Sequence, residues 1–122
     1  MYEKDFVSEE LVEFEIDKKK FKYKPTSAGD ENNWLNEYMV SDEEGKPKQD
    51  FLKLNKCKVA NLKAVPYDKE IINKIIKVNK EWKDLTRDQR WDLLCKLTPT
   101  LFDKIIRKIN NIDGPDETKK KD

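Results

Sequence analysis

The residue types that carry out most enzyme chemistry are missing or scattered in this 122-residue sequence. It contains no histidine, which removes the usual proton shuttle, the Ser-His-Asp and Cys-His nucleophile systems and most zinc sites. The three glycines, Gly29, Gly45 and Gly114, are not clustered, so neither a phosphate-binding loop nor a dinucleotide fingerprint is present. We therefore predict no catalytic, cofactor-binding or metal-binding residues.

The carboxylates and the two cysteines also lack the patterns that chemistry would require. No segment suggests the buried acid with a raised pKa that a paired-carboxylate hydrolase needs, and Asp42, Glu43 and Glu44 do not have the spacing of a calcium loop. Cys57 and Cys95 have no CxxC partner and are interpreted as free, partly buried thiols, with a disulfide between them as the alternative. We expect a protein that is not an enzyme and that binds another macromolecule.

The composition is that of a folded domain with an extensive polar surface. Charged residues make up 42% of the chain and apolar residues 36%, and three Trp, five Phe and four Tyr separate it from a disordered protein. No apolar run approaches the roughly 20 residues that span a bilayer, and the acidic first ten residues do not have the form of a secretory signal. We expect one domain over residues 1–115, a disordered tail at 116–122, no membrane partner and a cytoplasmic location.

The two halves of the chain carry opposite charge. Residues 1–50 have a net charge of −6 and residues 51–122 a net charge of +7, and the stretch 51–80 has eight lysines against Asp68 and Glu70. One interpretation is attraction between the halves, within the chain or head to tail between copies. The other is a nucleic-acid-binding module that uses the lysines of 51–80.

The first half alternates in hydropathy. Apolar residues from Val12 to Ile16 alternate with glutamates, and Phe21 and Tyr23 alternate with lysines, around a turn at 17–19. This pattern predicts a β-hairpin with one wet face, and it places the two rings opposite the lysines, which disfavours base stacking by these rings.

The segment after Pro25 begins with a capping pattern. Ser27 followed by Asp30 predicts the start of a short helix, whose inner face is marked by Trp34, Leu35, Tyr38 and Met39. Residues 41–50 have the composition of an exposed loop. For residues 51–65 a bulged strand and a helix from Leu54 to Leu62 remain open.

The C-terminal half predicts three helices. Asp68 caps the first, Thr86 with Gln89 forms a capping box for the second, and Thr98-Pro99 begins the third. The predicted inner residues run from Ile71 to Trp82 in the first helix, are Trp91, Leu94 and Cys95 in the second, and lie between Leu101 and Ile109 in the third, which Gly114-Pro115 ends. The fold class is therefore α+β: an N-terminal β-hairpin with a short helix, then a C-terminal three-helix unit.

Surplus apolar residues on these helices indicate where a protein partner would bind. The isoleucine stripe is wider than a small core can cover, and tryptophans beside a turn serve either as core residues or as interface anchors. We predict a contact surface near Ile72, Ile76, Trp91 and Leu101. A helix-turn-helix with 99–111 as recognition helix is a lesser alternative, because Asp103 would face phosphate with the wrong charge.

In order along the chain, four pieces resemble the tail assembly chaperones of long-tailed bacteriophages and prophages: Phe14 to Pro25, Ala28 to Tyr38, Arg90 to Leu94, and Leu97 to Ile109. The resemblance implies a non-enzymatic protein that coats the tape-measure protein during tail assembly, with tail tube subunits as further partners, in the host cytoplasm. It supplies no catalytic residues. A structural subunit of a phage particle, which would self-associate, is a third hypothesis.

Overall fold

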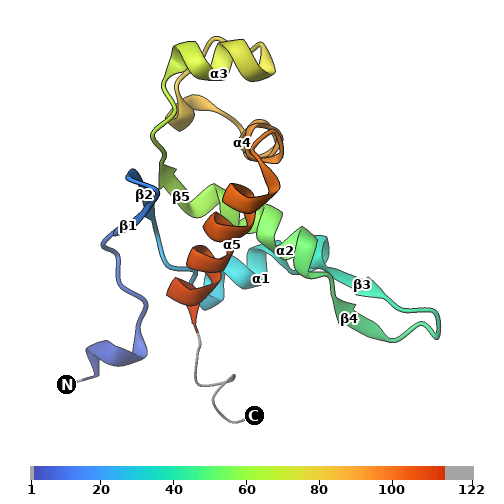
Figure 1. Ribbon diagram of the computed structural model, residues 1–122. Coiled ribbons are helices and arrows are strands. Elements are labelled where there is room, and N and C mark those ends of the chain that lie inside the picture. Colours follow the sequence, from blue (N-terminus) through green and yellow to red (C-terminus); the bar gives the residue numbers. More distant parts are fainter. Residues whose placement is uncertain (1, 115–122) are drawn as a thin grey trace.

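The computed structural model describes residues 2–114 and has an α+β fold (Figure 1). The tail predicted at 116–122 lies outside the described residues. The strands are β1 (Val12–Ile16), β2 (Lys19–Tyr23), β3 (Met39–Ser41), β4 (Pro47–Gln49) and β5 (Leu62–Ala64). The α-helices are α1 (Ala28–Tyr38), α2 (Phe51–Lys58), α3 (Lys69–Ile76), α4 (Arg87–Cys95) and α5 (Pro99–Asp113), and the short 3-10 helices are η1 (Glu3–Asp5), η2 (Val59–Asn61) and η3 (Trp82–Asp84).

The predicted N-terminal hairpin is confirmed. β1 and β2 pair antiparallel with Phe14 opposite Phe21 and Glu15 opposite Lys20, so the apolar side chains share the buried face and opposite charges share the wet face. The turn is one residue shorter than predicted. Asp17 and Lys18 both have positive φ, 51° and 68°, and they form the two-residue loop whose twist matches that of the strands.

In residues 51–65 the helical alternative holds up to Asn61, and only Leu62–Ala64 form a strand. Asp50 accepts a hydrogen bond from the backbone of Lys53 at 3.1 Å and starts α2, which passes through η2 into β5. β5 pairs with β2 as the third strand of a sheet in the order β1-β2-β5. Because β5 has only three residues, its own sequence carries too little alternation to reveal it.

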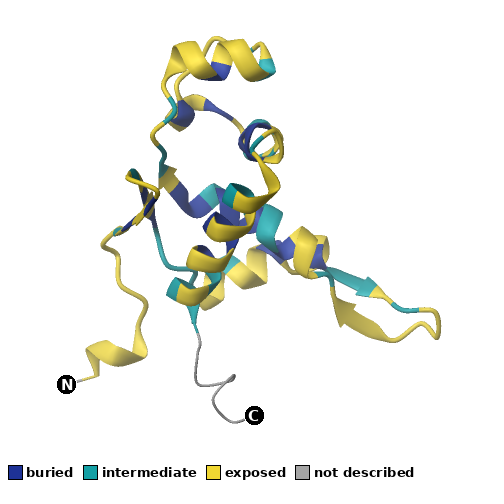
Figure 2. Ribbon diagram, viewed as in Figure 1, coloured by how far each residue is buried: buried dark blue, intermediate teal, exposed yellow. Residues whose placement is uncertain are grey.

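Residues 28–50 form a capped helix and a second hairpin. The reciprocal hydrogen bonds between Ser27 and Asp30 confirm the predicted start of α1. Residues 41–50 are not simply a loop, since β3 and β4 pair across a turn in which Gly45 has φ +82°. Figure 1 shows this hairpin projecting away from the rest of the molecule, and Figure 2 shows that β4 is exposed.

The first C-terminal helix is shorter than predicted. α3 ends at Ile76 because Lys77 takes a left-handed conformation at φ 62° and ψ 33°, so the helix does not continue to Trp82. Trp82 lies in η3 instead, and its indole Nε1 donates a hydrogen bond of 2.7 Å to the carbonyl oxygen of Leu62 in β5. This buried contact between distant segments overrides the helical spacing.

The second and third C-terminal helices begin as predicted. The capping box of Thr86 and Gln89 starts α4, and Thr98 caps α5 with Pro99 in its first turn. The inner face of α4 was partly wrong: Leu94 is fully buried, but Cys95 is exposed and Trp91 is half-buried. Arg90 is buried where a hydrophobic residue would be expected.

Two apolar clusters hold the described residues together. The larger joins the three-stranded sheet to α3, α4 and α5, and its fully buried side chains include Phe21, Tyr23 and Leu94. The smaller joins α1 and α2 through four buried residues: Trp34, Tyr38, Leu54 and Cys57. Both cysteines are free thiols, as predicted. Cys57 is buried in the smaller cluster, whereas Cys95 is exposed and not partly buried.

Candidate protein-binding groove

Two apolar cavities share a lining residue, Leu97, which lies between α4 and α5. The first has a volume of about 370 Å³ and is lined by Leu52, Trp91, Cys95, Leu97, Pro99 and Phe102. The second has a volume of about 170 Å³ and is lined by Tyr67, Ile71, Ile75, Leu93, Lys96 and Leu97. The two cavities lie on different sides of α4, with Trp91 and Cys95 lining the larger and Leu93 and Lys96 the smaller. Because both reach Leu97, we name them together the Leu97 groove.

Local sequence explains how each wall of the groove is positioned. The Asp50 cap sets the first turn of α2, which presents Leu52 with 62% of its surface exposed. The Thr98 cap and Pro99 turn the chain sharply from α4 into α5. The ring of Phe102 then meets the ring of Trp91 edge to face, with centroids 5.5 Å apart and an interplanar angle of 73°, a favourable geometry for an aromatic pair.

The α3 wall of the groove exists because the helix carries more isoleucine than the core can cover. Ile72 is fully buried, whereas Ile71 and Ile75 remain 42% and 43% exposed. Exposed aliphatic side chains of this size beside a concave surface are typical of protein-binding sites.

Three of the residues that line the groove have ionisable side chains: Tyr67, Cys95 and Lys96. Lys96 is the one charged residue among those that line it. The hydroxyl of Tyr67 is buried and has no hydrogen-bond partner among the described residues, and burial raises the pKa of this phenol. Burial, followed by the nearby carboxylate of Asp92, also raises the pKa of the Cys95 thiol. The groove therefore offers apolar contact area and one positive charge, whereas the Tyr67 hydroxyl is buried.

The four predicted contact residues do not come together in the structure. Trp91 lines the groove. Ile76 and Leu101 are partly buried and pack against the main core, and Ile72 is 0% exposed within that core. Ile72 therefore has no surface to offer a partner in this structure. The orientation of α3 directs Ile72 into the core and leaves Ile71 and Ile75 exposed to solvent.

Ten of the eleven residues that line the groove are absent from the predicted set, among them Leu52, Ile71, Ile75, Leu97 and Phe102. Four isoleucines in six residues of α3 were a usable signal, since two adjacent pairs cannot all face the core. No local signal identified Leu52, because the helical assignment of its segment was itself undecided.

The lysines of 51–80 are distributed over α2, β5, α3 and the segment after α3, which contains Lys77 and Lys80. Lys58 is withdrawn from solvent: its Nζ lies 3.0 Å from an Asp113 carboxylate oxygen and donates to Asn110 at 2.8 Å. Lys56 pairs with Asp88 at 3.1 Å. At least two of the eight lysines are thus already engaged by carboxylates.

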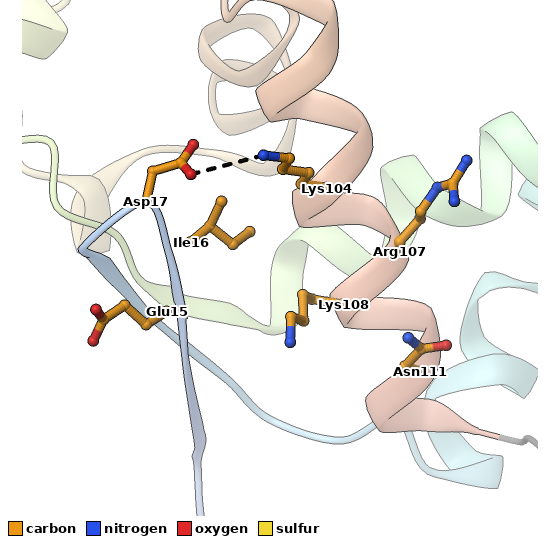
Figure 3. Close-up of a pocket in the computed structure, with 7 residues that line it drawn as sticks. All are labelled: Glu15, Ile16, Asp17, Lys104, Arg107, Lys108 and Asn111. Carbon is orange, nitrogen blue, oxygen red and sulfur yellow. Dashed lines mark ion pairs between the residues drawn. The ribbon is translucent and has the colours of Figure 1, made fainter.

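A further cavity of about 350 Å³ lies between the β1–β2 turn and α5 (Figure 3). Its charged groups are largely occupied: Lys104 reaches Asp17 at 3.7 Å, and Arg107 pairs with Asp103 at 2.8 Å. In Figure 3 Glu15 and Arg107 point away from each other, toward opposite sides. The side chains do not converge on a common point, so this cavity does not resemble a ligand site.

Within residues 2–114, no group of three or more His, Cys, Asp or Glu side chains is arranged to hold a metal ion. None of the helices in the described part of the chain is both long and apolar enough to span a bilayer. Comparison of the chain with protein-family models, with curated proteins and with solved structures found no match in any of the three.

Proposed function

We propose that this protein is a non-enzymatic binding protein that holds an apolar helical segment of another protein in the Leu97 groove. The observation that carries the proposal is the pair of apolar cavities that share Leu97 as a lining residue. Buried aromatic and aliphatic anchors supply most of the affinity of such contacts, and an amphipathic helix that lays its apolar face into a groove is a common mode of recognition.

The charge near the groove indicates which charges a partner helix should carry beside its apolar stripe. Lys96 lines the smaller cavity, and residues 51–114, the part of the chain to which all the lining residues belong, contain fifteen Lys and Arg against eight Asp and Glu. A helix whose apolar stripe is flanked by carboxylates would match this surface, because opposite potentials favour encounter and orientation.

The resemblance to tail assembly chaperones supports one such partner, the tape-measure protein of a phage tail. A chaperone of this kind has to shield a long apolar helical protein, and the Leu97 groove has suitable dimensions and chemistry for one segment of it. We propose the tape-measure protein as the partner and tail assembly as the setting.

The test is co-expression with a tape-measure-type protein followed by pull-down. Leu52→Glu should abolish capture, because it places a carboxylate in the apolar groove at a position 62% exposed. Leu35→Glu is the matched control: Leu35 is 43% exposed and does not line either cavity, so capture should persist. Equal capture by both variants would show that the groove is not the binding surface.

The rival functions give different results in the same samples. Nucleic-acid binding would show affinity that falls steeply with salt, because phosphate neutralisation releases counterions, and would be insensitive to Leu52→Glu. A structural subunit would be found in finished particles, whereas an assembly chaperone would be absent from them.

A further inference from the structure

The first ten described residues form an arm that carries exposed apolar side chains. Tyr2, Phe6, Val7 and Leu11 are 73%, 77%, 37% and 45% exposed, and none of them belongs to either core cluster. We call residues 2–11 the N-terminal arm. Four large apolar residues in so short an exposed segment indicate a contact with something outside this copy of the chain.

The arm is also acidic. Glu3, Asp5, Glu9 and Glu10 outweigh the single Lys4. Glu9 lies 4.0 Å from Lys24 of the same chain, but the side chain of Glu9 is 88% exposed, so solvent screening leaves this pair weak. The arm thus combines aromatic and aliphatic anchors with carboxylates.

We propose that the N-terminal arm of one copy docks in the Leu97 groove of a second copy, an inference that rests on the same groove as the proposed function. The arm has the chemistry deduced for the partner: its apolar anchors, flanked by carboxylates, suit the apolar cavities, and Lys96 lines the smaller of the two. The larger cavity, at about 370 Å³, is of a size to receive an aromatic side chain such as Phe6.

The direction of the arm indicates a second copy as the occupant. Figure 1 shows the arm running from β1 away from α3 and α4, which form much of the groove. The opposite charges of the two halves of the chain also suit contact between copies, with the acidic N-terminal part of one against the basic C-terminal part of the next. The contact is between different surfaces, so it links copies head to tail.

Docking of the arm would cover the apolar groove while the partner is absent. A partner helix would then have to displace the arm, so self-association and partner binding exclude each other at each groove. The arm would act as a built-in competitor that weakens binding of poorly matched partners.

The experiment is sedimentation velocity between about 1 µM and 1 mM, where contacts of modest area dissociate. An arm variant, Phe6→Ser/Val7→Ser, keeps the groove, and a groove variant, Leu52→Glu/Lys96→Glu, keeps the arm. Wild type should self-associate, and each variant alone should dissociate at least tenfold more readily, as expected when an anchor is lost. An equimolar mixture of the two variants should form a 1:1 heterodimer, because one intact arm meets one intact groove.

All four substituted positions are exposed, so the fold should survive, and circular dichroism would check it. Leu35→Glu should associate like wild type. A monomeric wild type, or a mixture of variants that stays monomeric, would overturn the proposal; docking of the arm on its own chain gives the first of these results.

Partner binding separates this inference from the proposed function. If the arm variant captures the tape-measure-type protein while the variant mixture stays monomeric, the arm proposal fails and the function stands. If the mixture forms the heterodimer but no variant captures the partner, the function fails and the arm proposal stands.

Discussion

At the scale of single residues, two buried charges tie distant segments together. Arg90 donates from Nε to the carbonyl of Trp82 at 3.2 Å and from Nη1 to Ala60 at 3.3 Å, with its guanidinium carbon 5.0 Å from the Trp82 ring centre. Asp113 accepts from the Tyr23 hydroxyl and the Thr26 amide, both at 2.8 Å, and pairs with Lys58. The planar guanidinium of Arg90 can donate to carbonyls in several directions. A hydrophobic side chain could not replace these hydrogen bonds, nor those that Asp113 accepts.

Removing Lys58 should be costly because it leaves the Asp113 carboxylate buried without its counter-charge. Lys58→Met is expected to lower the free energy of unfolding by about 3 kcal/mol, as for other broken buried pairs. Lys56→Met on the same helix is the control: its partner Asp88 is 76% exposed, so the loss should be below about 1 kcal/mol. Urea denaturation of both variants measures the difference, and equal losses would contradict the role of the buried pair.

Tyr23 should make the protein less stable in alkali. Burial, and after it the negative charge of Asp113, raises the pKa of Tyr23 well above its ordinary value. The folded protein therefore keeps a proton that the unfolded chain releases. This contribution is complete below about pH 10 and declines above it by up to about 1.4 kcal/mol per pH unit.

Tyr23→Phe tests this dependence. It should lower the unfolding free energy at neutral pH by about 1 kcal/mol through the lost hydrogen bond, and flatten the decline above pH 10. Some decline should remain because burial also raises the pKa of Tyr67. Tyr2→Phe, at an exposed position, is the control, and an unchanged alkaline slope in Tyr23→Phe would refute the assignment.

At the scale of elements, local chemistry set most boundaries. Side-chain caps start α1, α2, α3, α4 and α5, and four of these starts were predicted from the sequence. Two other boundaries depend on residues with left-handed backbone that are not glycine: Lys18 in the β1–β2 turn and Lys77 at the end of α3. Such residues bear a steric cost that glycine avoids.

Lys18→Gly should therefore stabilise the β1–β2 hairpin. Lys18 sits at φ 68° in the two-residue turn, where Asp-Gly is a favoured pair, and relief of the steric cost should add about 0.5 to 1 kcal/mol to the unfolding free energy. Lys22→Gly, the same substitution at an exposed strand position, should destabilise by about 1 kcal/mol. Relative to wild type, the midpoint temperature of thermal unfolding should rise in Lys18→Gly and fall in Lys22→Gly. A shift of both midpoints in the same direction would be inconsistent with the turn geometry.

At the scale of the whole molecule, the two cysteines report on different places. Cys57 is 1% exposed in the α1–α2 cluster, whereas Cys95 is exposed and lines the Leu97 groove. A thiol reagent should modify Cys95 in the folded protein and Cys57 only after unfolding, because only an accessible thiolate reacts.

The rate at Cys95 should rise with pH and fall when the groove is occupied. Burial raises the pKa of this thiol, so the thiolate fraction is small at pH 7 and increases toward alkali. Modification at matched pH should be slower at high protein concentration in wild type than in Phe6→Ser/Val7→Ser. Equal rates in the two proteins would argue against arm docking, and Cys95→Ala identifies the reacting group.

The sequence by itself determined the α+β class, the first hairpin, the starts of four of the five capped helices and the end of α5. Each of these depends on residues within one or two turns of one another, such as Ser27 with Asp30 or Thr98 with Pro99. The absence of histidine likewise needed no structure.

Only the tertiary structure decided β5, the end of α3 and the Leu97 groove. β5 exists because β2 offers it a partner, and Trp82 leaves the helical pattern because its indole is bonded to Leu62. Of the residues predicted for a contact surface, Trp91 lines the groove and Ile72 is buried in the core, whereas Leu97 was not among them. Hydrophobic periodicity shows which residues share one face of a helix. Whether that face is exposed depends on which neighbouring elements cover it, and that is a property of the packed molecule.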